Sequence, residues 1–96
     1  MSRRVIFKFR LYVAGDAANS AEALANLTAL CGEHLPHRHE IDLIDVFNEP
    51  ERALTDGIYM TPTLVKLSPS PVCRIVGTLS EPLTLLRVLG IGARVA

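Results

Sequence analysis

The sequence predicts an α/β domain with a mixed sheet and the element order β-α-β-α-β-β-α. Three features of the 96-residue chain predict this fold: an alternating apolar segment near the N-terminus, a helical repeat after it, and a hairpin followed by a helix near the C-terminus. We expect one domain, residues 1–96, which is long enough to bury about 60–65% of its unfolded surface without disulfides.

The first strand is expected at residues 5–13, where apolar and polar positions alternate before Gly15. A period of two with aromatic and β-branched residues is typical of a strand with one buried face. The face expected to be buried carries Val5, Phe7, Phe9, Leu11 and Val13. Lys8 and Arg10 would lie on the opposite face.

A helix is expected next, at residues 19–32, because Leu24, Leu27 and Cys31 recur at helical spacing. Asn19 with Glu22 three residues later suits a capping box, although Ser20 could equally be the cap. Gly32 would end this helix in a left-handed conformation.

The later elements are expected as a loop at 34–40, a strand at 41–47, a short helix within 51–60, strands at 60–67 and 72–77, and a helix at 81–90. Gly57 would weaken the short helix by about 1 kcal/mol relative to Ala. Ser80 would cap the last helix, Pro82 would occupy its first turn and Gly90 would end it. This order, with Thr-Pro-Thr at 61–63 before an apolar strand, is typical of the thioredoxin-like arrangement.

The overall composition argues against several classes of function. Ten basic residues balance ten acidic ones, whereas binding to nucleic acid needs a basic surface. The N-terminal residues provide neither a signal peptide nor a membrane-spanning segment. With only two cysteines, a disulfide framework is not expected, and we predict a cytoplasmic protein with reduced thiols.

The residues give little support for catalysis. A redox dithiol needs two thiols at the junction of the first strand and helix, but residues 14–20 contain no cysteine, so Cys31 and Cys73 are interpreted as buried structural residues. His34, His37, His39 and Glu40 could supply metal ligands, but they lie in a proline-containing loop where adventitious binding is favoured. We therefore expect no catalytic residue, no cofactor and no specific metal site.

Two local features have alternative interpretations. The Thr61–Pro62 peptide could be cis, or Pro62 could be a trans proline that opens a strand. The strand at 41–47 would lie at a sheet edge, where Asp42 and Asp45 could repel other strands and Phe47 could anchor a partner. Core packing is the alternative for Phe47.

Four segments together resemble the KaiB family: "LYVAG…NS" at 11–20, "IDV…NEP" at 44–50, "TPTLVKL" at 61–67 and "PSPVCRIVGTLS" at 69–80. The resemblance implies a non-catalytic regulatory protein that binds a KaiC-like hexameric ATPase. The alternative it offers is a stand-alone adaptor that binds a sensor kinase, as a relative of the KaiB-like sensor domain of the SasA kinase. A homodimer or homotetramer is also compatible with it.

The resemblance further implies two possible folds, because the family alternates between a thioredoxin-like form and a tetrameric βαββααβ form. The hairpin signal at 64–77 and the capped last helix favour the thioredoxin-like form for this chain. The other form would need helix across residues 61–67, where Pro62 fits only in a first turn. The residues expected to matter for the choice of fold are Pro62, Gly77 and Thr78.

Some positions depart from the family pattern. Glu22 and Asp42 stand where relatives commonly carry basic residues, and Thr78 stands where Asp is frequent. Acidic residues there would slow docking onto an acidic partner, so a partner with a matching surface is expected. The residues expected to bind the partner are Glu22, Asn26, Asp42, Asp45, Phe47 and Asn48.

Overall fold

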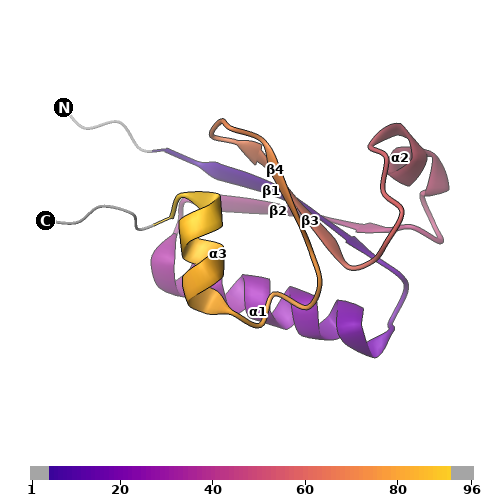
Figure 1. Cartoon of the computed structure of the whole chain (residues 1–96), viewed down its shortest axis with the longest axis horizontal. Helices are drawn as coiled ribbons and strands as arrows, with labels where there is room; N and C mark the ends of the chain where they lie inside the picture. The colour runs from indigo at the N-terminus through magenta and orange to yellow at the C-terminus, as the bar shows by residue number, and fades with distance from the viewer. Residues whose placement is uncertain (1–4, 92–96) are drawn as a thin grey trace, which may run out of the picture.

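The computed structural model describes residues 5–91, which form a four-stranded sheet with helices on both faces (Figure 1). In chain order the elements are β1 (Phe7–Val13), α1 (Ala18–His34), β2 (His39–Asp45), α2 (Pro50–Thr55), β3 (Thr63–Ser68), β4 (Cys73–Val76) and α3 (Pro82–Leu89). The strand order is β2-β1-β3-β4, with β1 parallel to β2 and antiparallel to β3, and β4 antiparallel to β3. The predicted element order, the mixed sheet and the edge position of β2 are confirmed.

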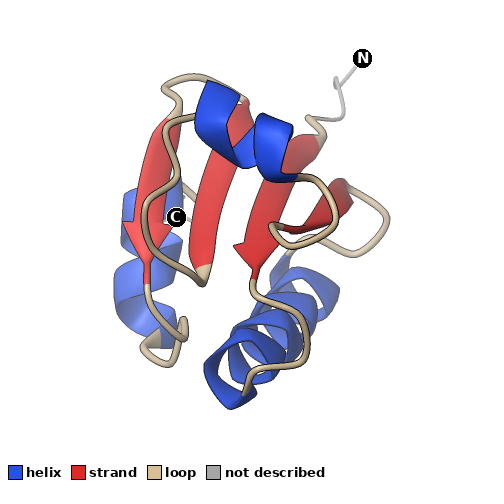
Figure 2. Cartoon of the chain, turned by 90° about the vertical axis from the view of Figure 1, so that its right-hand side faces the viewer, coloured by secondary structure: helices blue, strands red, loops and turns tan. Residues whose placement is uncertain are grey.

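The sheet separates two apolar cores of different size (Figure 2). The larger core lies under α1 and α3, and β1 contributes Phe7, Phe9, Leu11 and Val13 to it. The smaller core lies under α2 and consists of Tyr12, Ile44, Ala53 and Val65. Burying a large apolar side chain completely contributes about 1.5–3 kcal/mol, so the larger core supplies most of the stability. The prediction for Val5 was wrong, because this side chain precedes β1 and is 41% exposed.

Both ends of α1 differ from the prediction. The N-cap is Ala17, which has no side-chain cap bond, so neither Asn19 nor Ser20 is the cap. Ser20 instead points inward and is buried, and its Oγ accepts a hydrogen bond from the Ala14 N–H at 3.0 Å. The helix also continues through Gly32 to His34, because an exposed glycine with ordinary helical geometry does not stop a helix whose neighbours are packed.

The later elements also have shifted boundaries. α2 ends at Thr55, before Gly57, which adopts a left-handed conformation (φ 67°) instead of lying inside the helix. α3 has Glu81 rather than Ser80 at its N-cap, whereas the predicted Pro82 start and Gly90 end are confirmed. β2 ends at Asp45, so Phe47 lies in the loop that follows it.

The segment before β3 is fixed against β4. The Thr61–Pro62 peptide is cis, and the Pro62 carbonyl accepts a hydrogen bond from the Gly77 N–H at 3.0 Å. Further along β3, the buried Lys66 donates from Nζ to the Leu89 carbonyl at 3.0 Å. A cation at the C-terminal end of a helix interacts favourably with the helix dipole, so Lys66 holds α3 against the sheet.

Candidate docking surface

The six residues expected to bind a partner do not form one continuous group, and for brevity we call them the α1–β2 residues. Asp45, Phe47 and Asn48 lie together where β2 ends. Glu22 is exposed on α1, on the face of the sheet that carries the larger core. Asp42 is exposed on the opposite face of the sheet. It pairs with Arg10 of β1, and paired residues on neighbouring strands share a face. Glu22 and Asp42 are therefore separated by the sheet.

The corner after β2 is held by one carboxylate. Asp45 Oδ1 accepts hydrogen bonds from the Gly15 N–H at 3.1 Å and the Phe47 N–H at 2.9 Å, and Asn48 Nδ2 donates to Oδ2 at 3.4 Å. Asp45 thus joins the ends of β1 and β2. Repelling other strands at the sheet edge would be a secondary role for this carboxylate.

Phe47 is the outermost apolar group of this corner. Its side chain is 73% exposed, which is incompatible with the core-packing alternative. One side of the ring lies against Gly15, where a Cβ atom would be 3.4 Å from Phe47 Cδ2. Gly15 has a φ of 57°, so glycine is suited to this position for both its conformation and its lack of a side chain.

Asn26 connects α1 to the segment after β4. Its Nδ2 donates to the Thr78 carbonyl at 2.8 Å, and the side chain is half-buried. Asn26, which was expected to bind a partner, is therefore hydrogen-bonded to Thr78, which was expected to affect the choice of fold. Thr78 takes part through its backbone, so the same contact would be available with Asp at this position.

Replacing Asn26 with Ala should lower the free energy of unfolding by about 0.5–1.5 kcal/mol, because the Thr78 carbonyl loses its partner. Urea denaturation followed by circular dichroism measures this change. Asn48→Ala is the matched control, since Asn48 is exposed and makes a single long side-chain contact. Equal effects of the two substitutions would contradict a structural role for Asn26.

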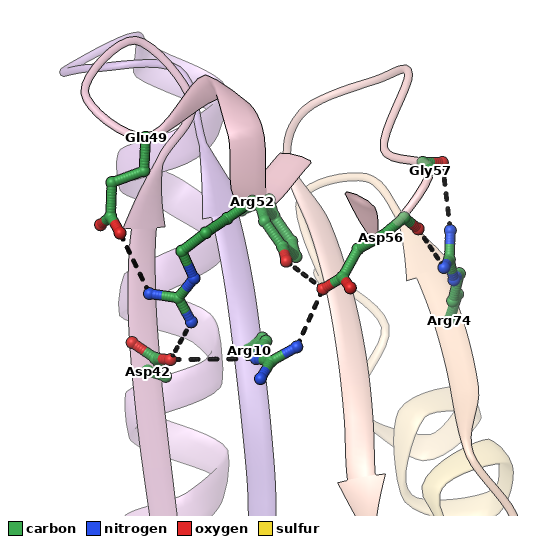
Figure 3. Close-up of polar contacts among 8 residues, drawn as sticks. Arg10, Asp42, Glu49, Arg52, Asp56, Gly57 and Arg74 are labelled. Atoms are coloured by element: carbon green, nitrogen blue, oxygen red, sulfur yellow. Dashed lines mark hydrogen bonds and ion pairs between the residues drawn. The ribbon is translucent and has the colours of Figure 1, made fainter. Parts of the chain in front are cut away.

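Asp42 belongs to an ion-pair network that joins β1, β2 and α2 (Figure 3). Arg52 Nη2 lies 2.6 Å from Asp42 Oδ2, and Arg10 Nε lies 3.9 Å from the same oxygen. Arg52 also pairs with Glu49 at 3.1 Å. The hydrogen bond to Asp42 is the main reason that the pKa of Arg52 lies above its ordinary value. The negative charge of Asp42 is thus offset by its neighbours.

A second carboxylate, Asp56, continues this network toward β4. It accepts hydrogen bonds from the Tyr12 hydroxyl and from Arg10 Nη1, the latter at 3.0 Å. The Tyr12 bond, with Arg10 in support, lowers the pKa of Asp56. Burial, followed by the interaction with Asp56, raises the pKa of Tyr12 to about 12. Arg74 on β4 donates to the backbone carbonyls of Asp56 and Gly57.

The sequence did not indicate a role for Tyr12, Arg52, Asp56 or Arg74. Arg52 follows Glu49 by three residues, which is a weak sequence signal for an ion pair in a helix. The contacts of Tyr12 and Arg10 with Asp56 span more than 40 residues and carry no local signal.

The sulfur and imidazole groups remain dispersed. Cys31 is buried, and burial raises the pKa of its thiol to about 11, so it is a poor nucleophile. Cys73 was also expected to be buried, but it is only half-buried on the edge strand β4. Within residues 5–91 both thiols are free, and no three His, Cys, Asp or Glu side chains gather to hold a metal ion. His39 Nδ1 instead lies 2.8 Å from the Leu35 carbonyl.

No helix within residues 5–91 has the length and apolar character needed to cross a membrane. The fold and the site together define a thioredoxin-like domain whose β1–α1 junction, residues 14–18, lacks the cysteine pair. Residues 10–91 match the family described as "KaiB domain". Because this match covers most of the chain, the protein belongs to the KaiB family.

Known proteins agree with this assignment. The chain is 40% identical over 72 residues to the circadian clock protein KaiB3 of Synechocystis, which covers 75% of this chain and 71% of the relative. The N-terminal domain of Synechococcus elongatus SasA superposes with a TM-score of 0.74 at 16% identity, over 94% of this chain and 89% of that domain. Chloroplastic thioredoxin z gives a TM-score of 0.74 at 19% identity, over 91% and 78% of the two chains. The last two similarities support the fold alone.

Proposed function

We propose that this protein is a non-catalytic regulator that docks on a KaiC-like ATPase in a circadian, timing or stress signalling system. Membership of the KaiB family, shown by the match over residues 10–91, is the observation that carries the proposal. The curated relatives are named as circadian clock proteins, which is consistent with it.

Phe47 is the residue best suited to anchor the partner. Because the aromatic ring of Phe47 is 73% exposed, its burial by a partner would remove a large apolar surface from water and so favour binding. Aromatic residues dominate binding energies at protein interfaces. The Asp45 bonds to the Gly15 and Phe47 amides already order the surrounding backbone. Little further ordering is then needed when the partner binds.

Charge at this surface differs from that inferred from the sequence alone. Asp42 is offset by Arg52, whereas Glu22 forms no hydrogen bond or ion pair with other residues in the range 5–91. Glu22 is thus the acidic group with the stronger external field. The partner is expected to carry a basic group opposite α1.

The Phe47→Ser variant should weaken binding to a KaiC homologue from the same organism by about tenfold or more, because it removes the anchor. Biolayer interferometry and co-elution in gel filtration, under ATP- and ADP-bound conditions, measure the interaction. Leu54→Ser is the matched control, since Leu54 is similarly exposed (75%) and is not one of the α1–β2 residues.

The Glu22→Arg variant tests the charge separately. The rate constant for association with the ATPase, and the salt dependence of this rate constant, should change more than the free energy of unfolding does. Exposed charges act mainly on the diffusional encounter of the two proteins. Asp42→Lys is less suitable, since it would place a third cation beside Arg10 and Arg52. Failure of the unmodified protein to bind the ATPase in any nucleotide state would contradict the proposal, and binding to a sensor kinase instead would support the adaptor role.

A further inference from the structure

Residues 49–60, which include α2, cross the smaller core, and we call them the strap. Ala53 is the one strap residue that is fully buried, and Ile58 packs against the core while remaining half-buried. The large apolar side chains of Leu54, Tyr59 and Met60 are exposed instead. Because the methyl group of an alanine removes little apolar surface from water, hydrophobic contacts hold the strap weakly.

Polar contacts connect the strap to three strands (Figure 3). Arg52 lies 2.6 Å from Asp42 of β2, and Asp56 lies 3.0 Å from Arg10 of β1. On β4, Arg74 donates hydrogen bonds to two backbone carbonyls of the strap. The strap is therefore held to the sheet largely by charged side chains.

Dissolved ions have access to these contacts. The side chains of Arg52 and Asp42 are 38% and 49% exposed, and a hollow of about 260 Å³ borders Arg10, Arg52 and Asp56. Salt screens charges that are in contact with water, because the Debye length falls from about 10 Å at 0.1 M to about 3 Å at 1 M. High salt should therefore weaken the attachment of the strap while it leaves the apolar contacts of α1 intact.

The strap covers an apolar surface that is otherwise complete. Tyr12, Ile44 and Val65 are buried in the smaller core, and all three belong to strands of the sheet. The neighbouring strands hold these residues in place whether or not the strap is present, since β1 is paired with both β2 and β3. Removal of the strap would thus uncover one aromatic and two aliphatic side chains on an intact sheet.

We infer that residues 49–60 form a salt-sensitive strap, which opens as a unit while the sheet stays folded and so uncovers Tyr12, Ile44 and Val65. Segments with few buried apolar contacts open at a lower free energy than the whole domain. Opening also separates Arg52 from Asp42, so the carboxylate of Asp42 regains its full charge at the β2 edge. The strap therefore controls both an apolar surface and a charge, and this inference does not depend on binding of the ATPase.

Amide hydrogen exchange followed by NMR, at about 0.1 M and about 1 M KCl, tests the inference. The Asp56 and Ile58 amides bond within the strap, to the Arg52 and Ala53 carbonyls at 3.1 and 2.9 Å. Helices as short as α2 are not stable alone in water, so these bonds break when the strap leaves the sheet. Exchange at both amides should become about fivefold faster in high salt, whereas exchange at Leu27 of α1 should change little.

The Arg52→Met variant removes the ion pairs of Arg52 and keeps a long apolar side chain. Its strap amides should exchange about fivefold faster at low salt and should respond less to added salt. Arg87→Met is the matched control, because Arg87 is exposed on α3 and lies outside the network. Exchange that is equally fast in the strap and in α1, or strap exchange that neither salt nor Arg52→Met changes, would overturn the inference.

A thiol placed under the strap tests whether the apolar surface is uncovered. Val65→Cys is close to isosteric, and Cys73→Ser in the same chain removes the half-buried thiol of β4. Cys31 stays buried, so it should not react. The rate of reaction with a thiol reagent should rise with salt by the same factor as the strap exchange. A rate that does not follow the strap exchange would show that the strap frays without uncovering the sheet, which also overturns the inference.

Discussion

Replacing Leu27 with Ala is expected to lower the free energy of unfolding by about 3–5 kcal/mol. Leu27 is completely buried and packs in the larger core between α1 and the sheet. The inward face of α1 is otherwise made partly of small residues, Ser20 and Ala23, which contribute little apolar area. The structure around a deleted core side chain relaxes only partially, so the loss includes both a transfer and a cavity term. Urea denaturation followed by circular dichroism measures it.

This effect would be large for a domain of this size, whose total stability is about 5–15 kcal/mol. Leu54→Ala is the matched control, because Leu54 is 75% exposed and should change stability by less than about 0.5 kcal/mol. Because α1 carries Glu22 and Asn26, the Leu27 variant should also lose partner binding before it unfolds completely. A loss below about 1 kcal/mol would mean that α1 is held by other contacts.

The alternation along β1 correctly predicted the four residues that enter the larger core. It did not predict Tyr12, because at this end the strand is covered on both faces and Leu11, Tyr12 and Val13 are all buried. Alternation identifies one buried face and contains no information about a second layer. The small core under α2 is therefore apparent only from the structure.

The helix ends were mispredicted for a related reason. Ser20 satisfies the rule for a helix cap, yet its hydroxyl bonds to Ala14 inside the β1–α1 junction. Gly32 satisfies the rule for a helix stop, yet the packing of Leu30, Cys31 and Leu35 carries the helix to His34. In both cases tertiary packing outweighed a local preference that is worth about 1 kcal/mol.

Only part of the arrangement of the α1–β2 residues could be predicted. The sequence implies that Asp45, Phe47 and Asn48 lie close together, because they are neighbours in the chain. It assigned Asp42 a free charge, since nothing local indicates that Arg52 of α2 reaches back to β2. Whether the α1–β2 residues bind a partner stays a prediction, but the structure changes which of them are free to do so.

Raising the pH from about 10 to about 12 is expected to lower the contribution of Tyr12 to the free energy of unfolding by about 2 kcal/mol, because a shift of one pKa unit corresponds to about 1.36 kcal/mol. Burial and the bond to Asp56 raise the pKa of Tyr12 from 10.0 to about 12 in the folded protein. Between these values the unfolded chain loses the Tyr12 proton while the folded chain keeps it. The stabilisation is therefore fully present below pH 10 and is lost as the pH approaches 12. Urea denaturation at a series of pH values, with absorbance at 295 nm to follow tyrosine ionisation, measures both quantities.

The Tyr12→Phe variant separates this effect from general alkaline unfolding. It lacks the titrating hydroxyl, so the Tyr12-dependent part of the alkaline loss should disappear. At neutral pH the variant should be less stable by about 1–3 kcal/mol, because Asp56 loses the hydrogen bond that it accepts from the Tyr12 hydroxyl. Tyr59→Phe is the control, since Tyr59 is 91% exposed and makes no such bond in the described residues. If Tyr12→Phe keeps the full alkaline loss of stability, then the loss does not come from ionisation of Tyr12, and the combined effect of burial and Asp56 on the pKa of its hydroxyl is contradicted.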